Sequence, residues 1–552
     1  MTITKDTKAM AGAPKYEKRR LRIACCSMPM SGHLTPLMSL AETLAAQYEN
    51  NDDASSDDAN NVVLLVTLCY GAKRVESSCE AKGIQLVALS LGKGFDSDQD
   101  ISEFMVGEIP FPLVADRVSN QMDEALSAFR PDVIVSDFAC LASQEYAASR
   151  NIPLVVNWTG PFETLRDFLQ PVVNVSDKNF YIAAGGLFLS YSKITVGSLL
   201  FVFNINNMGT MMKRIQKSVN CGNSLYLVNS FWGFEKPRFL FYPNVLPIGP
   251  IGKPLPTSPD FSQSHPDLHL FLQTARQEER KILLVTTGSM VQMEEWMVKL
   301  LYEAFAKLAS EYSASIVWSL KEEQQGYLSE ENRRSPCFYF STWLPQPALL
   351  ASDFVDAVLT HCGWGGTLEC ISGGKPLVVL PFFADQMINA RLLLAAGCAV
   401  SIAALPSFNM DNSGRSSYVG PRSYGFGPKG LFEKLADFSR KGRLAVEPIV
   451  EGCAKVLTDP RYKTAASHLR ALSTGPGMGH SAARGYIEHA ARHGLGHLTE
   501  SGSSNGAGES SVPAKHASRL VGHRPLGFTL ALCALTAGAA AMATNAALRR
   551  RA

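Results

Sequence analysis

Residues 343–386 read WLPQPALLASDFVDAVLTHCGWGGTLECISGGKPLVVLPFFADQ. Apolar runs at 355–360 and 377–380 have the length of buried strands, and a glycine-rich turn at 361–366 leads from the first run into a helix pattern. At such a turn, backbone N–H groups and the helix dipole together can hold an anion. The stretch therefore predicts strands of a parallel sheet and an anion-binding helix start.

The polar and aromatic side chains along this stretch suit a nucleotide that carries a sugar. Trp343 can stack on a base, His361 stands beside the helix start, and Glu369 can accept bonds from a ribose diol. Asp385 and Gln386 follow the second strand and can read sugar hydroxyls. Each residue alone has an ordinary explanation as core, helix surface or cap, but the combination favours a nucleotide-sugar site.

The remainder of the chain alternates strand and helix patterns in two halves. Alternation of this kind predicts parallel sheets covered on both faces, with ligands bound at the carboxyl ends of the strands. The fold class expected is α/β, with two Rossmann-like parallel-sheet domains that face a cleft. The expected strands are 21–26, 62–68, 84–89, 133–136 and 154–157 in the first half, and 282–287, 315–320, 338–343, 355–360 and 377–380 in the second.

Composition shifts divide the chain further. Residues 161–222 are rich in bulky apolar groups and are interpreted either as a cap over a lipophilic cleft or as ordinary core or membrane-contacting surface. The expected divisions are a disordered arm at 1–20, a first domain at 21–250, a linker at 251–268, a second domain at 269–490, a flexible linker at 500–524 and a candidate transmembrane helix at 525–548.

The C-terminal segment is a candidate for a membrane-spanning helix. Residues 526–548 run without a charge before three arginines, and a helix of that length spans roughly 34 Å, enough for a bilayer core. The expectation is a tail anchor on an intracellular membrane in a single-pass protein, with the larger domains on the cytosolic side. The alternative is an alanine-rich helix that does nothing, or that only touches membrane surfaces.

Charge and cysteine usage exclude several classes. A net charge of +2 over 552 residues gives no electrostatic case for a nucleic-acid partner. The twelve cysteines show no CxxC or Cys/His ligand spacing, which favours reduced thiols over a disulfide framework or a zinc site.

Two residues outside the opening stretch suit proton transfer. His33 lies between the first strand and the first helix, and a histidine can act as a base at neutral pH. Asp137 ends the apolar run DVIVS, where a carboxylate could orient the imidazole and stabilise its protonated form. The ordinary explanations are an unremarkable helix residue and a helix N-cap.

The stretch at 343–386 closely resembles the donor-binding box of the plant-type UDP-dependent glycosyltransferase family. His33 and Asp137 also resemble that family's catalytic pair. The resemblance extends over about residues 20–490 and implies the GT-B fold. It also implies inverting, metal-independent transfer of a hexose, with glucose favoured, from a UDP-sugar to a hydroxyl of a small lipophilic acceptor such as a phenolic, polyketide or terpenoid.

The resemblance implies a role for each matching residue. His33 is the expected base and Asp137 its partner. The expected donor-binding residues are Ser289, Trp343, Gln346, His361, Gly363, Trp364, Gly365, Gly366, Glu369, Asp385 and Gln386.

Within the donor set, the resemblance assigns uracil stacking to Trp343, a ribose or base contact to Gln346, and a phosphate contact to His361. Glu369 is expected to bind both ribose hydroxyls. Asp385 and Gln386 are expected to bind the sugar, and a glutamine at the last position is associated with glucose in the family. No cofactor or metal is expected besides the UDP-sugar co-substrate.

Gly365 and Gly366 depart from the family, which usually has Asn and Ser at these positions. Two side-chain donors are therefore missing, each worth roughly 1.5–3 kcal/mol when bonded to a charged group. This departure concerns donor affinity more than reaction type. The alternatives are a sterol or lipid glucosyltransferase and a catalytically inactive, membrane-anchored subunit that binds UDP-sugar.

Overall fold

The computed structural model describes the backbone of about two thirds of the chain. The chain divides into two units, Met1–Glu500 and Ser501–Ala552, and the second unit lies wholly outside the described residues. The expected arm, most of 161–222, the 500–524 linker and the candidate span 525–548 also lie outside them. The described residues are 20–46, 60–92, 111–162, 164–165, 214, 223–236, 244–257, 259–288, 291, 293–382, 385–402, 407–410, 416–419 and 444–498.

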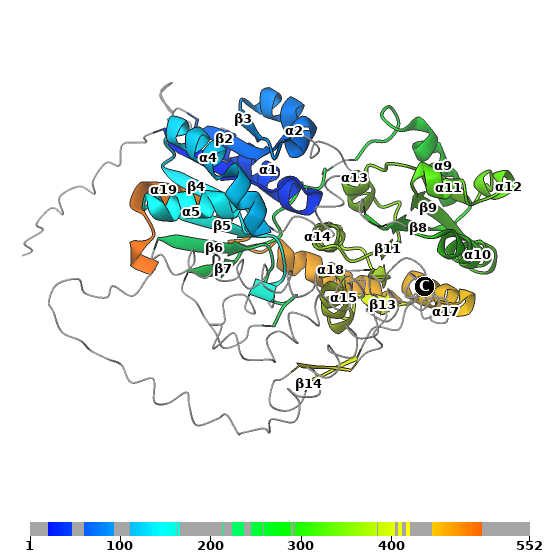
Figure 1. Cartoon of the computed structure of the whole chain (residues 1–552). Coiled ribbons are helices and arrows are strands. Elements are labelled where there is room, and N and C mark those ends of the chain that lie inside the picture. Colours follow the sequence, from blue (N-terminus) through cyan, green and yellow to red (C-terminus); the bar gives the residue numbers. More distant parts are fainter. Residues whose placement is uncertain are drawn as a thin grey trace, which may run out of the picture. The chain divides into compact units, whose positions relative to one another are not determined.

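The first half forms a seven-stranded parallel sheet in the order β3-β2-β1-β4-β5-β6-β7 (Figure 1). Its helices are α1 (Ser31–Ala45), α2 (Cys69–Lys82), α4 (Phe111–Phe129) and α5 (Leu141–Ser149). Its strands are β1 (Arg22–Cys26), β2 (Val62–Leu68), β3 (Gln85–Leu89), β4 (Val133–Asp137), β5 (Leu154–Trp158), β6 (Ser224–Val228) and β7 (Val245–Pro247).

The second half forms a six-stranded parallel sheet in the order β10-β9-β8-β11-β12-β13. Its strands are β8 (Lys281–Thr286), β9 (Ala314–Ser319), β10 (Phe338–Ser341), β11 (Ala357–Thr360), β12 (Leu377–Val379) and β13 (Ala399–Ser401). Its helices are α9 (Pro266–Gln277), α10 (Glu295–Glu311), α11 (Glu322–Gln325), α12 (Glu330–Arg333), α13 (Gln346–Ala351), α14 (Trp364–Ser372), α15 (Gln386–Ala395), α17 (Val446–Thr458) and α18 (Pro460–Ser473).

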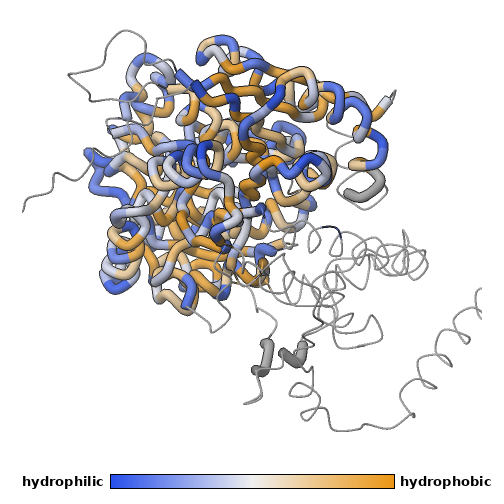
Figure 2. Tube along the Cα trace, turned by 90° about the vertical axis from the view of Figure 1, so that its left-hand side faces the viewer, coloured by the Kyte–Doolittle hydropathy of each residue, from blue (hydrophilic) through white to orange (hydrophobic). Residues whose placement is uncertain are grey.

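Alternation of side chains along each strand builds a core on both faces of each sheet. In β1, Ile23 and Cys25 join one apolar cluster, whereas Ala24 and Cys26 join the cluster on the opposite face. In β8, Ile282 and Leu284 join one apolar cluster, and Leu283 and Val285 join the cluster on the opposite face. In Figure 2 the hydrophobic stretches of the trace gather in the interior, and hydrophilic stretches lie largely at the outside. The predicted fold class, two Rossmann-like parallel-sheet domains, is confirmed.

The strand orders fix where a ligand can bind. In each sheet the chain starts in the middle, builds outward on one side, and then crosses to the other side. The crossing lies between β1 and β4 in the first sheet and between β8 and β11 in the second. Loops after such neighbouring strands diverge, and ligands bind in the crevice between them.

Five of the strands and the last helices were absent from the sequence prediction. β6, β7 and β13 extend the two parallel sheets, and β14 (Ser407–Met410) pairs antiparallel with β15 (Ser416–Val419). The final elements are α19 (Gly479–His493) and the 3₁₀ turn at Gly496–Leu498. The predicted boundaries between domains stay a prediction.

Helix α19 lies against the first sheet, although the predicted division places most of it in the second domain (Figure 1). Ala483, Ile487 and Ala490 join the apolar cluster beneath α1. The buried ion pair of Arg484 and Glu488 anchors the helix. Arg484 donates to two carbonyls at the end of α1, and Glu488 accepts from Asn61 just before β2.

Among the described residues, no helix is both long and apolar enough to span a bilayer. The ten cysteines that the structure describes form no disulfide with one another, and the reduced state of the thiols stays a prediction.

Replacing Glu488 with alanine should lower the free energy of unfolding by about 3–5 kcal/mol, because it leaves the buried guanidinium of Arg484 without a counter-charge. Urea denaturation followed by circular dichroism measures the loss. Glu295→Ala is the matched control, since Glu295 pairs with Lys299 at the exposed surface and its loss should cost under about 1 kcal/mol. Equal losses in the two variants would contradict the assigned anchoring role.

Candidate active site

His33 and Asp137 come together at the crossing point of the first sheet. His33 lies in the first turn of α1, directly after β1, and Asp137 is the last residue of the neighbouring strand β4. The imidazole Nδ1 lies 3.0 Å and 2.9 Å from the two carboxylate oxygens. Because Nδ1–H donates to the carboxylate, Nε2 keeps the lone pair that can accept a proton.

The surroundings of this pair set its charge. Asp137 is fully buried, and the side chain of His33 retains 18% of its exposure. Desolvation alone would lower the pKa of His33, but the Asp137 charge, its hydrogen bond and the charge of Asp385 together raise that pKa above its ordinary 6.5. The ring of Phe138 leans against the imidazole, with centroids 5.2 Å apart. The pair is therefore a base held in one orientation.

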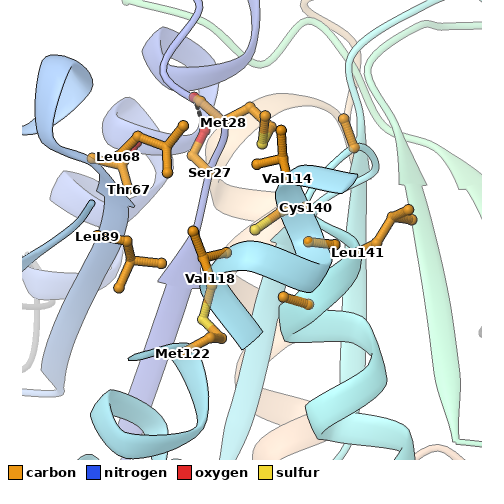
Figure 3. A pocket seen from close by; sticks show the side chains of 13 residues that line it. Ser27, Met28, Thr67, Leu68, Leu89, Val114, Val118, Met122, Cys140 and Leu141 are labelled. Carbon is orange, nitrogen blue, oxygen red and sulfur yellow. Dashed lines mark hydrogen bonds between the residues drawn. The ribbon is translucent and has the colours of Figure 1, made fainter. Parts of the chain in front are cut away.

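An apolar cavity lies beside the pair, beneath α4 and at the carboxyl ends of β1 to β3 (Figure 3). It adjoins Met28, whose N–H bonds to Asp137, and it contains the unpartnered hydroxyl of Thr67. Its volume of about 10 Å³ gives room for about one water molecule. As it stands, this cavity is too small for the predicted lipophilic acceptor. Most of the segment predicted to cap an acceptor cleft, 161–222, lies outside the described residues.

The second sheet presents a helix start at its crossing point. Gly363 is the N-cap of α14, no side chain caps the helix, and no acidic residue lies in its first turn. The N–H groups of Trp364, Gly365 and Gly366 are therefore free of a capping side chain, as anion binding requires. A Cβ at Gly365 would meet nothing within 4 Å, and one at Gly366 would meet only the Gln346 amide at 3.8 Å. Both positions therefore have space for the Asn and Ser side chains that the resembled family usually has there.

His361 is enclosed by two glycines. A Cβ at Gly288 or at Gly363 would lie 2.5 Å from Nε2 of His361, so both positions need glycine for the ring to fit. Gly288 also has φ +72°, a backbone region that side chains other than glycine rarely adopt. Burial lowers the pKa of His361 to about 4, so this imidazole is neutral at pH 7.

Glu369, one turn into α14, belongs to a hydrogen-bonded chain. Gln346 Nε2 donates to Glu369 at 2.7 Å, and the Thr286 hydroxyl donates to the Gln346 carbonyl at 3.0 Å. Burial raises the pKa of Glu369, while the Gln346 bond and the nearby charge of Lys253 oppose the rise. The structure thus gives Gln346 a positioning contact to Glu369; its predicted ribose or base contact stays a prediction.

The two tryptophans of the stretch have opposite environments. Trp343 is 66% exposed, and the His265 ring stacks on it with centroids 5.8 Å apart. The rings already touch, so a base would stack on the other indole face. Trp364 is buried, and its indole donates to the carbonyl of Asn229 at 2.8 Å. The side chain of Trp364 is therefore engaged within the protein, and its predicted donor contact stays a prediction.

Asp385 and Gln386 begin α15. Asn389 bonds both Asp385 Oδ2, at 2.7 Å, and the Cys362 carbonyl, at 2.9 Å, and so joins Asp385 to the loop before α14. Burial raises the pKa of Asp385, while the Asn389 bond and the charge of His33 oppose the rise. Gln386 is buried and accepts a bond from the Phe382 N–H. Sugar contacts by these two residues stay a prediction.

Charge coupling between His33 and Asp385 links the two halves of the site, because each influences the pKa of the other. Helix α1 also contacts α14. Ser289, the remaining predicted contact, lies outside the described residues. Three residues that contact or influence the site were not predicted from the sequence: His265, Asn389 and Lys253. Of these, His265 could have been noticed as an aromatic ring in the 251–268 stretch.

Among the described residues, no group of three or more His, Cys, Asp or Glu side chains is arranged to hold a metal ion. Transfer without a metal stays a prediction.

Comparisons with known proteins agree with this geometry. The family model for UDP-glucoronosyl and UDP-glucosyl transferase matches residues 205–413. A UDP-glycosyltransferase of Talaromyces amestolkiae is 25% identical over 50% of this chain and 56% of its own length. UDP-glycosyltransferase 73E1 of Stevia rebaudiana is 24% identical over 66% of this chain and 78% of its own length. The chain thus matches little more than half of the first relative.

Solved structures share the fold. UGT71G1 of Medicago truncatula, complexed with UDP-glucose, superimposes with a TM-score of 0.56 and 17% identity, over 86% of this chain and 99% of the other. The family model and the relatives thus make this chain similar to UDP-glycosyltransferases over part of its length, and the solved structure shows that it shares the GT-B fold.

Proposed function

We propose that this protein is an inverting, metal-independent UDP-glycosyltransferase that moves a hexose, glucose in the first instance, to a hydroxyl of a small lipophilic acceptor. The observation that carries the proposal is the His33–Asp137 pair at one crossing point, coupled in charge to Asp385 beside the uncapped start of α14 at the other. Acyl or phosphoryl transfer would not require this combination of a base and a nucleotide-sugar site.

The donor is proposed to bind along the second sheet. Uracil stacks on the exposed face of Trp343, and the ribose hydroxyls donate to the Glu369 carboxylate that Gln346 orients. The diphosphate takes the free N–H groups of Gly363 to Gly366, with Ser289 as a further contact, and neutral His361 donates a hydrogen bond to it. Asp385 and Gln386 hold the sugar.

The reaction is proposed to occur in one displacement. Nε2 of His33 takes the proton of the acceptor hydroxyl, whose oxygen forms a bond to the anomeric carbon. The bond from that carbon to the β-phosphate oxygen breaks, and its electron pair leaves with UDP. Asp137 stabilises the imidazolium that forms, and the N–H groups at the start of α14 stabilise the charge on UDP.

Fewer observations support the choice of donor sugar and of acceptor. Gln386 supports glucose through the resemblance alone, and the matching family model names both glucuronosyl and glucosyl transferases. Phenolics, polyketides, terpenoids and sterols all remain acceptor candidates. We also retain the proposal of a tail anchor at 526–548, outside the described residues, which would favour a sterol or lipid acceptor.

A screen of acceptors from these four classes with UDP-glucose, UDP-galactose and UDP-glucuronate, analysed by mass spectrometry, tests the function. A product heavier than its acceptor by one sugar is the expected result. UDP binding without product, and without slow release of UDP from any donor, would instead favour the inactive binding subunit. The intact His33–Asp137 pair is the observation against that alternative.

The pH dependence of transfer should follow His33. Protonated His33 cannot accept a proton, so kcat/KM should fall as the pH drops through its raised pKa, above 6.5. His33→Ala should lower kcat by about 10²–10⁴-fold without weakening UDP binding. Asp137→Asn removes the charge that raises the pKa, so the acid limb should move to lower pH while the rate falls. Histidine NMR titration measures the same shift without turnover, and an unmoved limb would contradict the assignment.

Glu369→Gln should weaken UDP binding about 10–100-fold, because a hydrogen bond to a charged carboxylate is lost. Calorimetry with UDP and 2′-deoxy-UDP makes this test specific. The wild-type protein should prefer UDP, whereas the variant should bind both nucleotides alike. A preference that survives in Glu369→Gln would remove Glu369 from the ribose site.

Restoring the side chains missing at positions 365 and 366 should strengthen donor binding. Gly365→Asn with Gly366→Ser has space for both side chains, and a gain of about 10-fold in UDP affinity is expected from the added donors. Gly363→Ala is the contrasting variant, because its Cβ would collide with His361 and should weaken binding. The phosphate site at α14 would be contradicted if the double variant did not bind UDP more tightly than Gly363→Ala.

A further inference from the structure

Trp364 connects the proposed donor site to the first domain. Its backbone begins α14, whereas its buried indole leaves the helix and donates to the Asn229 carbonyl, which follows β6 of the first sheet. Trp364 also stacks on Phe234, with centroids 5.7 Å apart and planes 22° from parallel. A single residue therefore presents its backbone to the donor and its side chain to the other domain.

Asn229 is itself held on two sides. Its amide donates to the Ile251 carbonyl at 2.6 Å, and its side-chain oxygen accepts from the Ile251 N–H at 2.5 Å. The Asn229 amide supplies both the donor and the acceptor that these two bonds need. At Gly249 the chain passes so near that a Cβ would lie 2.5 Å from the Ser230 nitrogen. The carbonyl that receives the indole is thus fixed in place.

The same segment continues to α1. Ser39 of α1 donates to the Gly252 carbonyl at 3.0 Å, and Ser39 also bonds His480 of α19 at 2.9 Å. Helix α1 carries His33 two turns earlier. A path of contacts, buried as far as Ile251 and partly buried at Gly252, therefore runs from α14 through Asn229 to the helix that bears the proposed base.

Packing reinforces this path. Phe231 and Phe234, which follow Asn229 in the chain, belong to the apolar cluster of the second sheet and not to that of the first. These rings shield the Trp364 hydrogen bond from water. If the bond breaks, no water can replace it, so leaving the buried donor and acceptor without a partner would cost free energy.

We propose that the Trp364 indole and Asn229 are positioning groups of the transfer reaction, which set the distance of the donor helix α14 from His33 on α1. This inference rests on the proposed function. Binding of UDP needs only groups of the second domain, whereas transfer also needs His33 of the first domain at the correct distance from the donor. Breaking the link should therefore lower kcat and leave nucleotide affinity unchanged.

Trp364→Phe tests the link, because phenylalanine keeps the stack on Phe234 and loses only the indole N–H and some ring volume. We expect kcat to fall about five- to ten-fold, the effect of one hydrogen bond, with UDP affinity and donor KM within about two-fold of wild type. Trp318→Phe is the matched control. Trp318 is fully buried in the second domain, and its indole N–H has no partner among the described residues.

Thermal unfolding separates positioning from packing. Both tryptophan variants lose ring volume and should lose similar melting temperature, but only Trp364→Phe should lose kcat. Equal kcat in the two variants would overturn the proposal. If the wild-type protein binds no UDP, the proposed function fails instead, so the two failures are distinguishable.

A second pair of variants tests the link if Trp364→Phe folds poorly. Asn229→Asp keeps the shape but sets a carboxylate against the Ile251 carbonyl, and kcat should fall with UDP affinity retained. Asn244→Asp is its control, because Asn244 also donates to a buried backbone carbonyl, that of Ser224, wholly within the first sheet. A fall of kcat in both aspartate variants, or in neither, would reject the link.

Discussion

The parallel pairing of β1 with β4, and of β8 with β11, is the constraint on which the site depends. Parallel strands end at one edge of a sheet, so residues far apart in sequence become neighbours there. His33 and Asp137 meet at one such edge although 104 positions separate them. Gly288 and His361 meet at the other. The topology brings these side chains together, and at the second edge Gly288, with φ +72°, leaves room for the His361 ring.

Each crossing has one histidine near it, His33 in the first turn of the helix after β1 and His361 directly after β11, yet their protonation differs. A buried carboxylate raises the pKa of His33, whereas burial without a carboxylate partner lowers that of His361 to about 4. The first environment favours a protonated imidazole, as the proposed base requires. In the second, a neutral ring avoids the desolvation cost of an unpaired charge, which suits the proposed phosphate contact.

Much of this was predictable from the sequence because apolar strand runs, glycine turns and strand-end polar residues carry local signals. The five predicted strands of the first sheet were confirmed, with bounds that differ by no more than one residue. The short β7 and β13 gave no periodic signal, since three residues cannot display alternation. The partners Asn389 and Lys253 were missed because their roles arise from contacts across the fold.

Trp364 marks the limit of inference from a motif, because a motif specifies residues but not which of their atoms face the ligand. The sequence correctly placed Trp364 at the helix start, where no side chain caps the helix. Its side chain nevertheless bonds to Asn229, 135 positions away, and no spacing within the 343–386 stretch could encode that partner. A residue whose backbone and side chain serve different domains couples them, so the helix start cannot move without disturbing the first domain.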